Sequence, residues 1–474
     1  MNTHTAEILI PAPSKLKKTE GKLPLNKLST FSVHKKFANL HADLEKLFFT
    51  LGMNIRSVSE NADITLSSDC SMTSGAWHMS ITPDGITAAA GDKNGASYAV
   101  YALAQILFGA AVRGLMEDTI DCAEISDEPR FPWRGFMLDS ARHFQDKDFI
   151  KKFIKILSVF RINSFHWHLV DSQGWRYPGS YTPKITGKGC WSVGHYTIDD
   201  LREINQYASD LGVRIVPEVD VPGHSQLILT NYPEYNCNPD NPAEEFCIGN
   251  PETMKFIKKI FTELMELFPD SPIIHIGGDE AATDNWEKCP ACRNAMQNKK
   301  LANMRELENS FMTELAEFII SKGRTPMIWG TCSGQLYPPE TIIQIWLDIR
   351  EPLKVIPHGN KTVYSVHNSL YFDYPANLDE PWETWMFELS EKGVYMTDPY
   401  IIWPERVKDG TLGTEACLWT ETVPQHRVMS KLFPRIFAYS ECTWSMPENK
   451  SWHDFVRRKE LLDAAGFTDF IKNL

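Results

Sequence analysis

The stretch that decides the fold reads Pro-Ile-Ile-His-Ile-Gly-Gly-Asp-Glu and occupies residues 272–280. It begins as a short apolar run bounded by Pro and Gly, which is typical of a strand buried on both faces. Gly277 and Gly278 follow, and they leave room for a ligand to approach the backbone. Asp279 and Glu280 end the stretch. The pattern predicts a buried strand that presents two adjacent carboxylates at its carboxyl end.

Seven other short apolar runs, each a candidate buried strand, occur along the chain. Together the eight candidate strands lie within residues 135–139, 163–171, 214–220, 272–280, 326–330, 341–346, 362–373 and 413–421. Helices are predicted between the earlier strands, over 149–160, from Thr197, from the N-cap Asn250 before Pro251, and over 304–320. Eight such units predict an α/β fold with a (β/α)₈ TIM barrel over residues 130–474. A doubly wound open sheet is the alternative, but the Gly-rich phosphate turn that it needs after its first strand is missing.

The chain before the barrel is predicted to form a small α/β accessory domain over residues 1–125. Strand-like segments lie at 7–10, 63–66 and 77–82, and a Pro-Asp-Gly turn joins the last of them to a further strand that ends at Ala89. A helix is expected from about Gly95 to Phe108. The polar stretch at 126–129 then predicts the domain boundary.

Composition narrows the class of partner. The formal net charge of −13 argues against a nucleic-acid partner, because phosphate binding needs a basic surface. The 14 Trp residues favour a carbohydrate ligand, since indole rings stack on the apolar faces of sugars, although a core role is an equal alternative. No apolar run approaches the roughly 20 residues of a membrane span. The N-terminal sequence lacks the apolar core of a secretory signal, so the protein is predicted to be cytoplasmic, or periplasmic or secreted if a signal has been removed.

The ten cysteines do not by themselves define a compartment or a metal site. Cys289 and Cys292 form a Cys-Pro-Ala-Cys motif, but no second pair at suitable spacing completes a zinc knuckle. Cys237 and Cys247 bracket a loop rich in Asn and Pro, which they could close as a disulfide or leave as two free thiols. We predict no metal and no cofactor.

Polar residues gather at the predicted strand ends, where barrel enzymes carry their active sites. A single acidic residue after a strand is most often a helix cap, but six of the eight strands end this way. Asp279 and Glu280 are the sharpest case, because two carboxylates this close cannot both ionise cheaply and one pKa should rise. A protonated carboxyl beside an ionised one is what general-acid cleavage of a glycosidic bond requires.

The adjacency of the two carboxylates also restricts the mechanism. A usual retaining glycosidase places acid and nucleophile about 5–5.5 Å apart across the anomeric carbon, which suits consecutive residues poorly. A division of labour suits them better, with Glu280 protonating the leaving oxygen and Asp279 orienting a 2-acetamido group of the substrate that itself attacks the anomeric carbon.

The order of motifs resembles that of glycoside hydrolase family 20, over nearly the whole chain. The motifs that carry the resemblance are FPWRGFMLDSARHF (131–144), FHWHLVDSQGWR (165–176), VPEVDVPGH (216–224), HIGGDE (275–280), YFDY (371–374) and LWTET (418–422). The resemblance implies a retaining exo-β-N-acetylhexosaminidase that removes terminal β-linked GlcNAc, or GalNAc, from a glycan through an oxazolinium intermediate.

The same resemblance implies a role for each site residue. The implied catalytic residues are Glu280, Asp279 and Tyr371, the last donating its hydroxyl to the acetamido oxygen. Arg134 is expected to hold the 3- and 4-hydroxyls, Glu421 the 4- and 6-hydroxyls, and Asp373 to lie near the 6-hydroxyl. The remaining implied residues are a polar layer beneath the pair (Asp171, Asp220 and His224) and an aromatic box around the acetamide and sugar ring (Trp329, Trp346 and Trp419).

Alternatives accompany these assignments. Arg134 lies at the start of its strand and is alternatively an ion pair at the bottom of the barrel, Trp346 plain core, and His224 a helix cap. A metal-dependent hydrolase would use His166 and His168 together with Asp220, His224 and Asp279 as ligands. A glycan-binding protein that has lost turnover is the non-enzymatic alternative.

Overall fold

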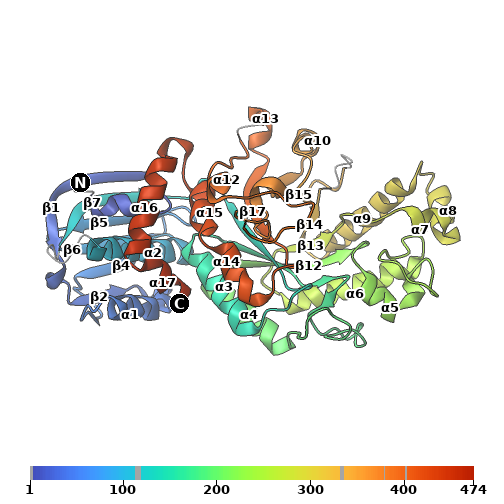
Figure 1. Cartoon of the computed structure of the whole chain (residues 1–474), viewed down its shortest axis with the longest axis horizontal. Coiled ribbons are helices and arrows are strands. Elements are labelled where there is room, and N and C mark those ends of the chain that lie inside the picture. The colour runs from blue at the N-terminus through green and yellow to red at the C-terminus, as the bar shows by residue number, and fades with distance from the viewer. Residues whose placement is uncertain (1–3, 113–118, 331–335, 378, 401–402) are drawn as a thin grey trace.

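A computed structural model describes residues 4–112, 119–330, 336–377, 379–400 and 403–474. The chain forms a sheet-and-helix part at its N-terminal end and a barrel that follows it (Figure 1). The elements of both parts arise where the sequence alternates short apolar runs with amphipathic ones.

The barrel is closed by eight parallel strands. In order around the barrel they are β8 (Trp133–Asp139), β9 (Ser164–His168), β12 (Arg214–Val221), β13 (Ile273–Gly277), β14 (Thr325–Trp329), β15 (Ile342–Ile345), β16 (Lys361–Tyr364) and β17 (Thr411–Leu418). Each lies within or overlaps one of the eight predicted runs, so the predicted TIM barrel is confirmed. Because all strands are parallel, their carboxyl ends meet at one end of the barrel.

Helices connect successive strands on the outside of the barrel. The longer ones are α3 (Lys147–Val159), α4 (Ile198–Asp210), α6 (Pro251–Leu267), α9 (Met304–Ser321) and α15 (Arg435–Trp444). The predicted helix starts are confirmed, because Thr197 closes a capping box with Asp200 and Asn250 accepts from the backbone N–H of Glu252. In the described parts of the connections after β14, the helices before α15 are all short, among them α10 (Pro352–His358) and α11 (His367–Leu370).

The N-terminal part is a seven-stranded sheet. Its strand order is β1 (Lys15–Pro24), β7 (Thr119–Asp127), β5 (Trp77–Thr82), β6 (Gly85–Ala90), β4 (Ile64–Ser68), β2 (Thr30–Val33) and β3 (Arg56–Ser57). Its two main helices are α1 (His41–Thr50) and α2 (Lys93–Val112). The predicted strands at 63–66 and 77–89 and the predicted helix are confirmed.

The predicted strand at 7–10 is wrong. Thr5–Ile8 forms a 3₁₀ helix, which Glu7 stabilises by accepting from the backbone N–H of His4. The edge strand β1 was not predicted, because its Lys-rich sequence is mostly exposed and carries no apolar alternation. The strand β7 extends to Asp127, two residues beyond the predicted limit of the accessory domain. The limits 1–125 and 130–474 stay a prediction.

The end of the chain returns to the N-terminal part. Helices α16 (Trp452–Ala464) and α17 (Phe467–Lys472), drawn in red, lie beside the blue N-terminal elements in Figure 1. Helix α16 contacts α2, and α17 contacts α3. The two parts are also joined by a buried ion pair between Arg161, after α3, and Asp127, at the end of β7.

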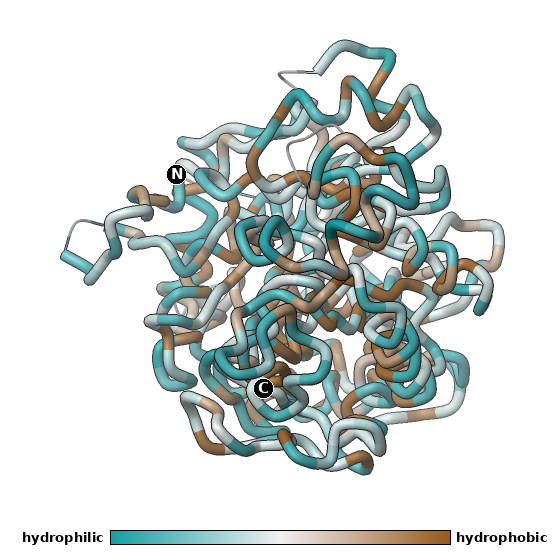
Figure 2. The backbone as a smooth tube through the Cα atoms, turned by 90° about the vertical axis from the view of Figure 1, so that its right-hand side faces the viewer, coloured by the Kyte–Doolittle hydropathy of each residue, from teal (hydrophilic) through white to brown (hydrophobic). Residues whose placement is uncertain are grey.

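Of the helices in the described ranges, none has both the length and the hydrophobicity that crossing a bilayer demands. In Figure 2, short hydrophobic and hydrophilic stretches alternate along the backbone tube.

Candidate active site

A cavity of about 410 Å³ opens at the carboxyl ends of the barrel strands. Its walls come from segments that follow six strands: β8, β12, β13, β15, β16 and β17. Eight of the twelve predicted site residues line it: His224, Asp279, Glu280, Trp346, Tyr371, Asp373, Trp419 and Glu421. The strand ends therefore bring together residues that lie almost 200 positions apart in the sequence.

The backbone after β13 is shaped to present the carboxylate pair. Gly277 and Gly278 have φ of 69° and 98°, and a Cβ at Gly277 would lie 1.8 Å from Asp220 Oδ1. Glu280 itself has φ of 52°, an uncommon conformation for a residue with a side chain. The turn separates the two carboxylates by environment. The side chain of Asp279 is 9% exposed, whereas that of Glu280 is 58% exposed.

His224 connects the two carboxylates to the polar layer below them. Its Nδ1 lies 2.7 Å from Asp220 Oδ2 and 3.9 Å from Asp279 Oδ1, and its Nε2 lies 3.5 Å from Glu280 Oε2. Burial opposes the charging of His224, but the carboxylates of Asp220 and Asp279 raise its pKa well above the usual value. His224 also has a positive φ, of 47°, so both ends of the His224–Glu280 pair have unusual backbone geometry.

The two carboxylates titrate differently, in the reverse of the order predicted. Burial, together with the negative charge of Asp220, raises the pKa of Asp279 well above its ordinary value. A hydrogen bond from His224 lowers the pKa of Glu280. One pKa of the pair is thus raised as expected, but it belongs to Asp279. Burial is the main cause at Asp279, whereas the hydrogen bond from His224 is the main cause at Glu280.

Arg142 is the arginine of the cavity. Its Nη2 lies 2.8 Å from Asp171 Oδ2 and 4.0 Å from Glu421 Oε1, and its guanidinium stacks 5.1 Å from the ring of Trp419. Asp139, at the end of β8, accepts from the backbone N–H of Arg142 and pairs with its Nη1 at 3.4 Å. The side chain is therefore held from below, with its guanidinium at the cavity wall.

The assignment of Arg134 to the sugar is wrong. Arg134 belongs to the amino-terminal half of β8, is 2% exposed, and does not line the cavity. Its guanidinium donates to the carbonyl oxygens of Arg161 and Phe131 and to the hydroxyl of Tyr98. It also stacks 5.0 Å from the ring of Trp444. The alternative, an ion pair at the barrel bottom, is right about the place of Arg134, but the partners that hold its guanidinium are carbonyls and a hydroxyl and not a carboxylate.

The three predicted tryptophans lie at different depths. Trp346 and Trp419 line the cavity, and the indole N–H of Trp346 donates to the carbonyl of Gly330. Trp329 lies deeper, at 1% exposure, where its indole N–H donates to Glu218 and its ring lies 5.7 Å from that of Trp419. Tyr371 completes this wall, with its ring 6.2 Å from that of Trp419.

Two further carboxylates face the cavity from β16 and β17. Asp373 is buried and accepts from the backbone N–H of Trp419 at 3.4 Å. Burial, with a contribution from Glu421, raises the pKa of Asp373 to about 8. Burial also raises the pKa of Glu421. Both carboxylates line the same cavity as Arg142.

The cavity contains residues that were not predicted to form the site. They are Arg142, Leu347, His367, Tyr374 and Trp385. Arg142 carried a signal, because it follows a predicted strand end by three residues, as Tyr374 does by one. Trp385 is 56% exposed and belongs to a segment without regular secondary structure, so no periodicity marks it.

The ligand set of the metal-hydrolase alternative does not form in the described part of the chain. His166 and His168 point into the barrel interior, where His166 lies 2.7 Å from Glu415 and 3.1 Å from Glu218. His168 is bound between Glu218 and Asp171. His166 groups with Glu218 and His275, whereas His224 groups with other carboxylates nearer the cavity. The two histidines serve a buried charge network instead.

Known proteins match both parts of the chain. "Glycosyl hydrolase family 20, catalytic domain" matches residues 131–447, and "Glycosyl hydrolase family 20, domain 2" matches residues 6–128. A β-hexosaminidase of Akkermansia muciniphila is 32% identical over 416 residues, which cover 83% of each chain.

Solved structures agree with these matches. A family 20 exo-β-N-acetylglucosaminidase from Vibrio harveyi, in complex with N-acetylglucosamine, superposes with a TM-score of 0.86 at 25% identity, covering 97% of this chain and 78% of that chain. A β-N-acetylhexosaminidase from Bacteroides fragilis superposes with a TM-score of 0.83 at 29% identity, covering 98% and 96%. From the barrel, the cavity at its strand ends and these matches, we conclude that the chain belongs to glycosyl hydrolase family 20 and is a β-N-acetylhexosaminidase.

Proposed function

We propose that the enzyme removes terminal β-linked GlcNAc from the non-reducing end of glycans with retention of configuration, by substrate-assisted catalysis. The observation that carries this proposal is the unsatisfied hydrogen-bonding capacity of the Asp279 carboxylate. Its Oδ1 is buried at the cavity wall and accepts no hydrogen bond from any described residue. An unsatisfied buried acceptor is costly, so this oxygen suits the N–H of an acetamido group.

In the proposed first step, the acetamido carbonyl oxygen attacks the anomeric carbon while the bond to the leaving oxygen breaks. Glu280 donates its proton to that leaving oxygen. Asp279 accepts from the acetamido N–H. The positive charge of the oxazolinium lowers the raised pKa of this neighbouring carboxyl, so the ionised Asp279 stabilises that charge as it forms. Tyr371 donates its hydroxyl to the acetamido oxygen, and burial, which raises the pKa of Tyr371, keeps that proton in place.

The second step reverses the first with water in place of the leaving group. Glu280, now ionised, takes a proton from a water that attacks the anomeric carbon and opens the oxazolinium ring. Two displacements at one carbon restore the original configuration. His224 supports both states of Glu280, since its Nε2 lies within 3.5 Å.

Glu280 must be protonated to act as an acid, although its pKa is lowered in the ligand-free site. A bound leaving group covers the exposed side chain of Glu280 and removes it from water. Desolvation raises the pKa of a carboxyl, so binding of the substrate itself is proposed to raise the pKa of Glu280.

The remaining polar groups are proposed to fix the hydroxyls of the terminal sugar. Arg142 takes the role first assigned to Arg134 and binds the 3- and 4-hydroxyls. Glu421 accepts from the 4- and 6-hydroxyls, and Asp373 lies near the 6-hydroxyl.

The acetamide and the sugar ring are proposed to be enclosed by Trp329, Trp346 and Trp419. From below, Asp171 and Asp220 orient Arg142 and His224. Because Arg142 and Glu421 are both assigned to the 4-hydroxyl, we also propose GalNAc, which differs from GlcNAc in the configuration of that hydroxyl, as a second substrate.

Hydrolysis of a chromogenic β-GlcNAc glycoside tests the activity. The wild type is expected to cleave it and also a β-GlcNAc oligosaccharide. Glu280→Gln should lose the activity on the oligosaccharide, because its sugar leaving group needs the proton of the acid. Asp284→Asn, an exposed change four residues further on, serves as the matched control and should keep full activity. A wild type that binds the glycoside without cleaving it would support the glycan-binding alternative instead.

A second experiment tests the mechanism. A thiazoline analogue of the oxazolinium should inhibit tightly, because it resembles the species that the site stabilises. Asp279→Asn should lower kcat by roughly 10²–10³-fold, the usual cost of one lost stabilising group. A covalent ester on Asp279, trapped with a 2-fluoro sugar and seen by mass spectrometry, would contradict substrate assistance.

A further inference from the structure

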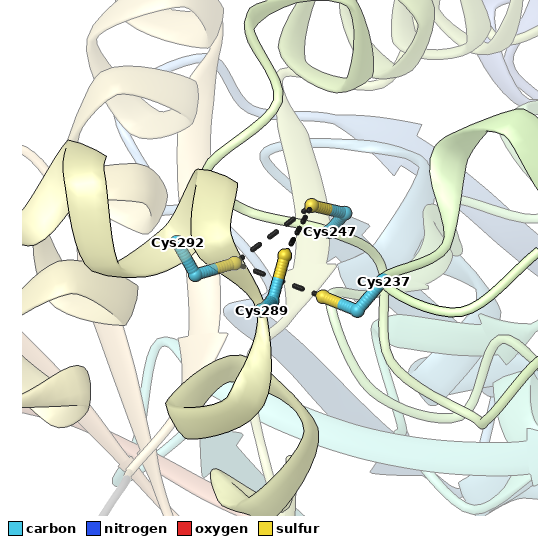
Figure 3. A group of neighbouring side chains, drawn as sticks. All are labelled: Cys237, Cys247, Cys289 and Cys292. Atoms are coloured by element: carbon cyan, nitrogen blue, oxygen red, sulfur yellow. Dashed lines mark hydrogen bonds between the residues drawn. The ribbon is translucent and has the colours of Figure 1, made fainter.

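Four cysteines from two separate segments meet in one cluster beside the barrel. Cys237 and Cys247 come from the long connection after β12, and Cys289 and Cys292 from the connection after β13. Figure 3 shows the four sulfur atoms pointing toward one another. Three of the four cysteines are buried. The second pair that the sequence lacked for the Cys-Pro-Ala-Cys motif is thus Cys237 with Cys247.

The spacing of the sulfurs is that of a metal site. Cys237 to Cys292, Cys247 to Cys289 and Cys247 to Cys292 are each 3.7 Å apart between Sγ atoms. All four lie within 4.8 Å of one another. Four thiolates at about 2.3 Å from a central Zn²⁺ form a tetrahedron with edges of about 3.8 Å. We propose that Cys237, Cys247, Cys289 and Cys292 bind a structural Zn²⁺ ion.

The backbone around the cluster is arranged to bring the two segments into contact. An isolated antiparallel bridge between Asn236 and Phe246 aligns the first cysteine pair. Gly249 then passes directly over the turn that carries the second pair, where a Cβ would lie 2.4 Å from the Cα of Cys292. A close approach of this kind requires a glycine.

The second pair has the local form of a zinc-binding turn. Cys289 caps helix α8 (Pro290–Asn298), which has Pro at its first position, and Cys292 lies in its first turn. Two cysteines separated by two residues are a usual half of a structural zinc site. Because all four ligands are protein thiolates, the site has no open position for a substrate and is structural.

The cysteine cluster lies where a bound metal would link two loops of the active site. The backbone N–H of Phe246 donates to Pro222, and that of Ser225 donates to Glu244, which ties the cysteine loop to the two sides of His224. Glu245 accepts from the backbone N–H of Ala282, two residues after Glu280. The metal therefore joins the loop of His224 to the loop of Glu280, and it fixes their distance from outside the cavity.

Two disulfides are the rival arrangement. Cys237 with Cys292 and Cys247 with Cys289 are each close enough to pair after a small approach. Cys247 lies as close to Cys292 as to Cys289, which a tetrahedral metal site requires and a pair of disulfides does not. The oxidised protein would hold no metal and no free thiol in this cluster.

Metal content decides between the two arrangements. The full-length protein, purified with Zn²⁺ and then passed through a desalting column, is expected to retain one Zn²⁺ per chain by plasma mass spectrometry. Protein expressed with Co²⁺ should show the strong sulfur-to-cobalt charge-transfer bands of a tetrahedral four-thiolate site. Non-reduced peptides that link Cys237 to Cys292 and Cys247 to Cys289, in protein without metal, would overturn the proposal.

Variants locate the ion. Cys292→Ser should lose the Zn²⁺, whereas Cys70→Ser, which changes an exposed cysteine outside the cluster, should retain it. Gly249→Ala keeps all four sulfurs but forces the two segments apart, so it should weaken Zn²⁺ retention during competition with a chelator. If Cys292→Ser is insoluble, the wild-type stoichiometry and the Gly249→Ala competition remain decisive. Full Zn²⁺ retention by soluble Cys292→Ser would place the metal elsewhere and overturn the assignment.

Discussion

Arg134 and Arg142 are buried arginines with different surroundings. Arg142 stands at the cavity wall against Asp171 and Trp419, while the guanidinium of Arg134 is occupied by backbone carbonyls and Tyr98 at the other end of β8. Burial alone does not distinguish them. The chemistry of their partners does, because carboxylates leave a guanidinium charge available to orient a ligand, whereas the carbonyls of a closed core serve only the fold.

Lysine in place of each arginine tests this difference. Arg142→Lys should lower kcat/KM by about 10- to 100-fold, the usual worth of one hydrogen bond to a charged group, because a lysine cannot reproduce the planar fork. Arg134→Lys should lower Tm but leave kcat/KM of the folded enzyme unchanged. Steady-state kinetics and thermal melts of both variants measure the two effects. If Arg134→Lys lowered kcat/KM and Arg142→Lys did not, Arg134 would be the arginine that binds the sugar.

Asp373 makes the stability of the protein depend on pH. Its pKa is about 8 in the folded state and near 3.9 in an unfolded chain. Between these values the folded state holds a proton that the unfolded state has lost, so the contribution to stability falls as pH rises toward 8. Asp373→Asn cannot ionise, so its Tm relative to wild type should rise between pH 5 and pH 9. A difference in Tm that does not change with pH would show that Asp373 is ionised throughout.

At the scale of elements, the end of β13 is the most constrained segment of the site. Gly277 and Gly278 combine positive φ with crowding, since a Cβ at Gly278 would lie 2.7 Å from Ile328. Strand and turn therefore act as one unit, in which the strand fixes position and the glycines turn Asp279 and Glu280 toward the cavity.

Gly277→Ala tests that unit, with Gly323→Ala as its control. Both residues have φ near 70°, but a Cβ at Gly323 would meet nothing within 4 Å. Gly323→Ala should cost only about 1–2 kcal/mol in the free energy of unfolding, the usual penalty of the left-handed conformation. Gly277→Ala should cost more and abolish most activity, because it displaces Asp220 and with it His224. Urea unfolding and kcat report these effects, and equal losses in the two variants would exclude the steric cause.

Elements whose sequence shows a clear period were predictable, and the others were not. The barrel strands are continuous apolar runs, and the helix starts at Thr197 and Asn250 carry local capping chemistry, so both could be inferred from neighbours in the sequence. The exposed strand β1 has no such signal. The short segment at 7–10 is apolar enough for a strand, but a capping interaction between His4 and Glu7 turns it into a 3₁₀ helix.

At the scale of the whole molecule, barrel closure decides which polar residues meet. Residues at strand ends could be assigned to one site because parallel strands share one end. The contribution of Trp385 and the meeting of two cysteine pairs depend on loop paths that no local pattern encodes. The place of Arg134, in contrast, could be read from its position at the start of a strand. Which carboxylate of the pair has the raised pKa depends on burial and on the hydrogen bond from His224, and both are properties of the folded chain.

The buried pair Arg161–Asp127 joins the N-terminal sheet to the barrel and should govern their cooperativity. Asp127 also accepts from the indole N–H of Trp444 and the backbone N–H of Ser14, and burial raises its pKa. Arg161→Met leaves that carboxyl buried without its cation, which typically costs about 3–5 kcal/mol. Calorimetry should therefore show a single transition in the wild type and an earlier unfolding of the N-terminal part in the variant.

Changing both partners, Arg161→Met with Asp127→Leu, should recover part of the loss, because no uncompensated charge remains. A matched exposed change, Arg202→Met, should have little effect. A loss in Arg161→Met no larger than in that control would mean that the ion pair does not hold the two parts together.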